Sequence, residues 1–114
     1  DIPDTDVSYI LGNAYKAAGL VLAMPTYEYK MFPPMAYVLD LFERKHITDK
    51  TVLRIGNWGW SGGAKKEYEQ KTAALKWNHL EQYEWQGKLL DADIRLLEER
   101  GAELARMVKT GVQA

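Results

Sequence analysis

Apolar residues recur along the first quarter of this chain with two different spacings, which predict a helix followed by a strand. One helix face is formed by Val7, Ile10, Leu11 and Ala14. This three-to-four-residue repeat predicts a helix over 4–16, with Gly19 in the place of a helix-capping glycine. The run 20–24 is apolar without alternation, which is typical of a parallel strand buried on both faces, and Pro25 ends it.

The middle of the chain repeats this order. A loop is predicted over 26–32, and the pair Pro33-Pro34 begins a second helix because proline is tolerated in a first helical turn. We expect Met31 and Met35 in the core. The β-branched, mostly apolar segment 51–55 predicts the next strand.

The last part of the chain continues the alternation. A helix is predicted over 64–76, and 79–85 alternates in the manner of an edge strand. Asp91 is expected to cap a long final helix. Its apolar stripe consists of Ile94, Leu97, Gly101, Leu104 and Val108.

Helices and strands therefore alternate along the whole chain, which predicts one fold class. Such alternation indicates an α/β protein with an open parallel sheet of about three strands, helices on both faces and right-handed crossovers. Its 114 residues suffice for a single domain, 1–114. The chain begins with Asp1, and we interpret it as the C-terminal part of a longer protein.

Composition excludes several classes of function. With 15 basic and 16 acidic residues the net charge is −1, which gives no reason to expect nucleic acid or an anionic membrane as partner. Cysteine is absent, so disulfides and thiolate chemistry are excluded. The longest apolar run, 17–25, is far below the ~20 residues of a membrane helix. We expect a cytoplasmic protein, and the two separate histidines His46 and His79 do not suggest a metal site.

Two loops of unusual composition follow predicted strands, at the edge where ligands bind in open α/β sheets. They are 25–30 and 57–62, and they contain aromatic side chains, hydroxyl groups and glycine amides. This combination suits a flat heteroaromatic ligand with polar edges. The alternative is that these residues only pack a corner of the fold. The candidate residues are Pro25, Thr26, Tyr27, Glu28, Tyr29, Asn57, Trp58, Gly59, Trp60 and Ser61.

Three sequence blocks resemble a known family when taken in order. Pro25-Thr26-Tyr27, Met31-Phe32-Pro33-Pro34 and Gly59-Trp60-Ser61-Gly62-Gly63-Ala64 resemble the flavodoxin-like FMN domain of flavodiiron proteins, or A-type flavoproteins. The resemblance implies a flavodoxin-like fold in which both loops hold the isoalloxazine ring of FMN. An FMN-dependent quinone reductase of the same fold is a further alternative, although that class is not expected to contain the Gly59–Ala64 block.

The resemblance also implies a role and a set of partners. The domain would be a flavoprotein module for electron transport in an oxidoreductase. Electrons would come from a redox partner such as a rubredoxin or an NADH-dependent reductase. They would pass to a diiron domain of the parent chain, which reduces oxygen or nitric oxide.

The chain also departs from that domain, because no hydroxyl-rich phosphate loop precedes the strand at 20–24. Backbone amides of such a loop hold the phosphate of FMN, so we expect binding to be weakened or lost. The strand 20–24 would lack its usual neighbour, and an apolar open edge favours self-association into a homo-oligomer. The alternative function is therefore a truncated interaction fragment that does not bind FMN.

Overall fold

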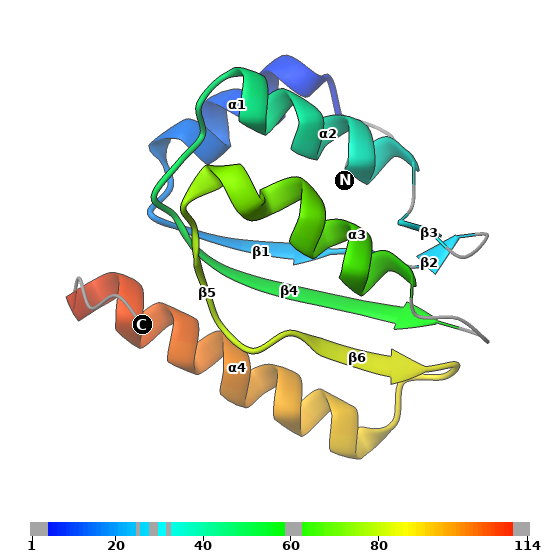
Figure 1. Cartoon of the computed structure of the whole chain (residues 1–114). Coiled ribbons are helices and arrows are strands. Elements are labelled where there is room, and N and C mark those ends of the chain that lie inside the picture. The colour runs from blue at the N-terminus through cyan, green and yellow to red at the C-terminus, as the bar shows by residue number, and fades with distance from the viewer. Residues whose placement is uncertain (1–4, 25, 28–29, 32, 59–62, 111–114) are drawn as a thin grey trace.

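The computed structural model describes residues 5–24, 26–27, 30–31, 33–58 and 63–110, and these form three layers (Figure 1). In chain order the elements are α1 (Val7–Lys16), β1 (Gly19–Ala23), β2 (Thr26–Tyr27), β3 (Lys30–Met31), α2 (Pro33–Arg44), β4 (Thr51–Trp58), α3 (Gly63–Thr72), a 3-10 turn (Ala73–Leu75), β5 (Asn78–His79), β6 (Tyr83–Gln86) and α4 (Asp91–Thr110). Helices α1–α3 cover one face of a sheet, and α4 covers the other (Figure 1). The predicted open α/β architecture with helices on both faces is confirmed.

Strand β4 is the centre of the main sheet. On one side it pairs in parallel with β1, from Gly19 opposite Thr51 to Ala23 opposite Ile55. On its other side it pairs in parallel with β5 and then with β6, so the four strands occupy three positions. The prediction of about three parallel strands is confirmed. Strand β4 runs to Trp58, three residues beyond its predicted end.

The strand predicted over 79–85 is interrupted by a bulge between β5 and β6. His79 lies opposite Val52, and Tyr83 lies opposite Ile55. Two residues of β4 therefore face three residues, 80–82, on the other strand, which is the signature of a β-bulge. After the bulge Glu84 points to the α3 side of the sheet, and Tyr83 points to the α4 side, where its hydroxyl donates to the Asp93 carboxylate at 2.5 Å.

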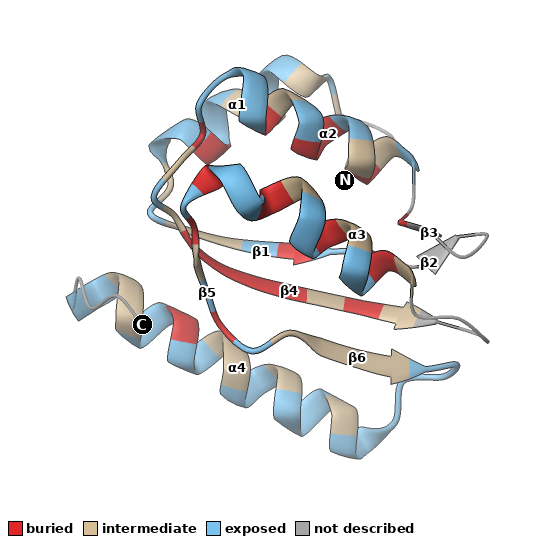
Figure 2. Ribbon diagram, in the orientation of Figure 1, coloured by how far each residue is buried: buried red, intermediate tan, exposed pale blue. Residues whose placement is uncertain are grey.

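Two apolar clusters hold the layers together. The larger cluster lies between the sheet and α1–α3, and Figure 2 shows buried residues along β4 and on the inner sides of α2 and α3. It includes Met31 and Met35, as predicted. The smaller cluster joins the other face of the sheet to α4 through Leu53, Leu80 and Leu104. Because this second cluster is small, it buries less of α4 than the predicted apolar stripe implies, and Ile94 is still 42% exposed.

Local details at the ends of elements differ from the predictions for physical reasons. Asp6 caps α1, since its carboxylate accepts the backbone N–H of Ser8 at 2.9 Å. Gly19 does not cap that helix; it begins β1, where an added Cβ would lie 2.6 Å from the Val108 side chain of α4. Asp91 is the first residue of α4, and Asp93 accepts the N–H of Leu90 instead.

The prediction that the first strand is buried on both faces was wrong for the part of the chain described. Leu22 is buried against the α1–α3 side, whereas Val21 on the opposite side is 53% exposed. Among the described residues β1 has a sheet neighbour on one side only, namely β4. This edge strand contains no charged residue, and charge is one of the usual protections against pairing with another chain.

Candidate functional site

The candidate site lies at the edge of the sheet where β1 and β4 end. Because the two strands are parallel and in register up to Ala23 and Ile55, the segments that follow them leave the sheet side by side. The first segment forms the β2–β3 hairpin, which lies at the carboxyl end of the sheet (Figure 1). The hairpin also contacts β4 directly through β2. The strands that precede the two candidate segments, β1 and β4, are therefore neighbours in the sheet.

Four of the candidate residues belong to strands instead of the loops predicted for them. Thr26 and Tyr27 form β2, with Thr26 opposite Met31 and Tyr27 opposite Lys30 in antiparallel pairing. Asn57 and Trp58 are the last residues of β4 and are paired with β6. Asn57 is half-buried and lies one residue before the end of β4. The candidates outside the described residues are Pro25, Glu28, Tyr29, Gly59, Trp60 and Ser61.

The start of the hairpin is fixed to β4 by a close approach of two backbones. The N–H of Met24 donates to the carbonyl of Ile55 at 3.0 Å. The carbonyl oxygen of Met24 then lies against Gly56, so that a Cβ on Gly56 would collide with it. Glycine is needed at this position because any side chain would separate the end of β1 from β4.

The end of the hairpin is fixed to α3 by a side chain that sequence reasoning missed. The N–H of Met31 donates to Oε1 of Glu67 at 2.9 Å, across 36 positions of sequence. Met31 itself is 2% exposed, and the flanking Met24 is 1% exposed. A signal was available in the sequence, because Glu67 lies between the buried positions Ala64 and Tyr68 on α3, where a carboxylate is unusual.

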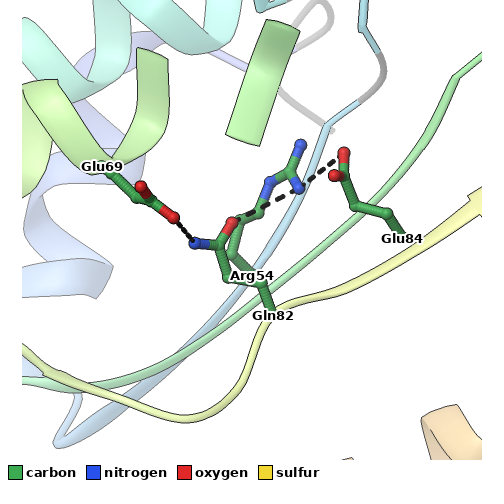
Figure 3. Close-up of polar contacts among 4 residues, drawn as sticks. All are labelled: Arg54, Glu69, Gln82 and Glu84. Carbon is green, nitrogen blue, oxygen red and sulfur yellow. Dashed lines mark hydrogen bonds and ion pairs between the residues drawn. The ribbon is translucent and has the colours of Figure 1, made fainter. Parts of the chain in front are cut away.

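A buried guanidinium lies between the sheet and α3, beside Gly56. The Arg54 side chain is fully buried, and its Nη1 is 2.9 Å from a carboxylate oxygen of Glu84 on β6 (Figure 3). The same nitrogen lies 3.4 Å from Oε1 of Gln82, whose amide donates in turn to Glu69 of α3 at 3.0 Å. Among the described residues, Nε and Nη2 of Arg54 have no hydrogen-bond partner, and the contact with Glu84 is ionic without hydrogen-bond geometry.

A separate groove of about 410 Å³ lies between α3 and the β5 side of the sheet. Within it the Tyr68 hydroxyl is 3.1 Å from Nδ1 of His79, and the two rings meet edge to face. Burial lowers the pKa of His79 from its usual value, and the Glu69 carboxylate partly opposes that change. The groove is not part of the candidate site, because it lies beside β5 and not at the carboxyl ends of the strands.

Two further observations concern metal ligands and membrane-spanning helices. In the ranges that the structure describes, no group of three or more potential ligands is arranged to hold a metal ion. Within the same ranges no helix combines the length and the apolar character needed to cross a membrane.

Comparison with known proteins shows the fold. No family model and no curated protein matches the chain. Among solved structures it is similar to the Flv1 flavodiiron core from Synechocystis sp. PCC6803, with a TM-score of 0.87, 20% identity and 97% of this chain covered. It is also similar to the rubredoxin oxygen:oxidoreductase of the anaerobe Desulfovibrio gigas, with a TM-score of 0.76, 20% identity and 86% covered.

A third solved structure is a flavodoxin from the domain Archaea, with a TM-score of 0.81, 23% identity and 95% of this chain covered. The match spans 74% of that flavodoxin, but only 28% of the Flv1 chain and 25% of the Desulfovibrio chain. The chain therefore has a flavodoxin-like fold and resembles one part of the flavodiiron proteins. The resemblance inferred from the sequence is confirmed at this level.

Proposed function

We propose that this chain binds FMN at the carboxyl edge of its sheet and serves as the electron-transfer domain of a flavodiiron-type oxidoreductase. The observation that carries the proposal is the meeting of the β2–β3 hairpin with the end of β4. These are the two places where the sequence resembles the ring-binding loops of flavodiiron proteins. Similarity to flavodiiron and flavodoxin structures supports the same reading.

The described residues fit a flat ring with polar edges in two respects. The backbones of β1 and β4 approach each other closely at Met24 and Gly56, which brings both binding segments to one place. Asn57 at the end of β4 supplies an amide group that can both donate to and accept from ring atoms. FMN, when bound, supplies the redox chemistry, and the protein supplies binding, orientation and exclusion of water.

The wider role belongs to the same proposal. An electron donor such as a rubredoxin or an NADH-dependent reductase would reduce the flavin. A diiron domain of a longer parent chain would accept the electrons and reduce oxygen or nitric oxide. The name of the Desulfovibrio protein, a rubredoxin oxygen:oxidoreductase, supports a donor of this class.

FMN titration with flavin fluorescence tests the binding proposal. Aromatic side chains stacked on the ring should quench the fluorescence saturably. Replacing one of them, in Trp60→Ala, should weaken binding by about tenfold, because stacking contributes about 0.5–1.5 kcal/mol beyond area burial. Tyr15→Ala is the matched control, since Tyr15 is 70% exposed. It lies at the end of α1, just before β1 begins, and so at the edge of the sheet opposite the candidate site. Absence of quenching at millimolar FMN would refute the proposal.

A second candidate function is an interaction module that assembles through β1. The observation that favours it is the uncharged β1 edge, where Val21 is 53% exposed and no second neighbour lies among the described residues. Equilibrium sedimentation of the chain and of Val21→Lys distinguishes the two candidates. An oligomer that Val21→Lys dissociates, together with no FMN binding, would favour the interaction module.

A further inference from the structure

We propose that Glu67 is a positioning residue for the flavin site, because its carboxylate fixes the β2–β3 hairpin to the helix that follows the second ring-binding segment. This inference rests on the proposed function and deepens it. Its structural part, the anchoring of the hairpin, can be tested without any ligand.

The hairpin depends on external anchors because it is very small. Each strand has two residues, and a two-stranded hairpin of this size is not stable alone in water. At its start the anchor is the bond from Met24 to Ile55. At its end the described polar anchor is the bond from Met31 to Glu67, at 2.9 Å.

Glu67 is carried by a rigid element. Its helix, α3, begins at Gly63 and is held against the sheet by Ala64 and Tyr68, which are 0% and 1% exposed. The helix that carries the Glu67 carboxylate is therefore fixed in position relative to the sheet. A backbone N–H that donates to a carboxylate makes a charge-assisted bond, roughly twice as strong as a neutral one.

The position of Glu67 in the chain gives this bond its significance. Helix α3 begins directly after residues 59–62, which are part of the second ring-binding segment. The same helix thus continues one binding segment and holds the end of the other. The bond from Met31 to Glu67 therefore links the two binding segments. It fixes the distance between them before a ring is inserted.

Removing this bond should lower FMN affinity without changing any group that touches the ring. A freed hairpin has to be ordered when the ligand binds, and that ordering reduces affinity. Loss of a hydrogen bond to a charged acceptor corresponds to about a tenfold decrease in affinity or more. Glu67→Gln keeps an oxygen acceptor at the same position, so it should recover most of the loss.

The test compares Glu67→Ala, Glu67→Gln and the control Gln70→Ala, which changes an exposed residue of the same helix. Hydrogen exchange at the Met31 amide is followed by NMR without ligand, and FMN affinity is measured by fluorescence quenching. We expect Glu67→Ala to lose Met31 protection and to bind FMN about tenfold more weakly. The Gln70→Ala protein should behave as wild type in both measurements, and Glu67→Gln should lie close to it.

Several results would overturn the inference. One is unchanged Met31 protection in Glu67→Ala, and another is lost protection with unchanged FMN affinity. If Glu67→Ala does not fold, Glu67→Asp, whose carboxylate is one methylene group shorter, takes its place with the same expected and overturning results. Failure of the wild-type chain to bind FMN would instead refute the proposed function, and the Met31 exchange data would still decide whether Glu67 anchors the hairpin.

Discussion

The buried Arg54–Glu84 pair predicts an unusual order of stabilities among three variants. Removing only the negative charge, in Glu84→Gln, leaves a fully buried guanidinium whose Nε and Nη2 already have no partner in the described part of the chain. Removing only the positive charge, in Arg54→Met, leaves Glu84, whose side chain is 16% exposed and can turn toward water. The first change should therefore be the more damaging one.

The magnitudes follow from the geometry. At 2.9 Å the attraction between unit charges is at most about 6 kcal/mol with an effective dielectric constant of about 20. Desolvation of both ions offsets much of that attraction, and loss of one partner of a buried pair typically costs about 3–5 kcal/mol. Because Glu84 retains some exposure, we predict about 3 kcal/mol for Glu84→Gln and about half of that for Arg54→Met. The double variant Arg54→Met/Glu84→Gln should match or exceed wild-type stability, since it also removes two unpaired nitrogen atoms.

Urea denaturation of the four proteins forms a double-mutant cycle that measures these differences. The slope of the free energy of unfolding against urea concentration has to stay constant across the four for the comparison to hold. Two results would refute the reasoning. One is a Glu84→Gln protein within about 1 kcal/mol of wild type, which would mean that the guanidinium reaches water. The other is a double variant as unstable as Glu84→Gln.

Three further predictions concern single positions. Gly56→Ala should lower the free energy of unfolding by about 1–3 kcal/mol in urea denaturation, because its Cβ would collide with the Met24 carbonyl; an unaffected protein would contradict this packing. Gly12→Ala, in α1 with nothing within 4 Å of the added Cβ, should raise it by about 1 kcal/mol in the same assay, and a loss would contradict the open surroundings. The pKa of His79 is lowered in the folded state, so the unfolded chain binds more protons as the pH falls through 6.5, and stability should fall in that range. His79→Gln should flatten this pH dependence in urea titrations between about pH 5 and 8, and an unchanged dependence would refute the assignment.

Periodicity in the sequence predicted the elements that are long enough to carry it. The first two helices, the central strand and the order of helices and strands were all predicted from spacing. The β2–β3 hairpin was not, because strands of two residues have no period to detect. The bulge after His79 was missed because a single extra residue looks the same as normal alternation until the pairing partner is known.

The candidate site was predictable as a place and less so as a set of contacts. Parallel strands end at one edge, so the alternation of elements was enough to assign the starts of 25–30 and 57–62 to the same edge of the sheet. That their strands are neighbours came only from the pairing of β1 with β4. Strand β4 extends three residues beyond its predicted carboxyl end, so Asn57 belongs to the strand and not to the loop that was predicted there. The partners of Glu67 and Arg54 lie 36 and 30 positions away. The sequence could mark Glu67 as an unusual carboxylate between two buried positions, but it could not identify the group that either side chain contacts.

The bulge between β5 and β6 allows this edge strand to be one residue longer than the stretch of β4 that it faces. The three residues 80–82 face two residues of β4, so His79 and Tyr83 lie on opposite faces of the sheet although they are four positions apart. Deleting one of the three would leave two residues facing two, so the strand would pair without a bulge, and Tyr83 and Glu84 would keep their present faces. A single-residue deletion inside β6, where each residue faces one residue of β4, would instead turn the side chains after it to the opposite face. Natural variation in length by one residue is therefore expected at 80–82 and not within β6.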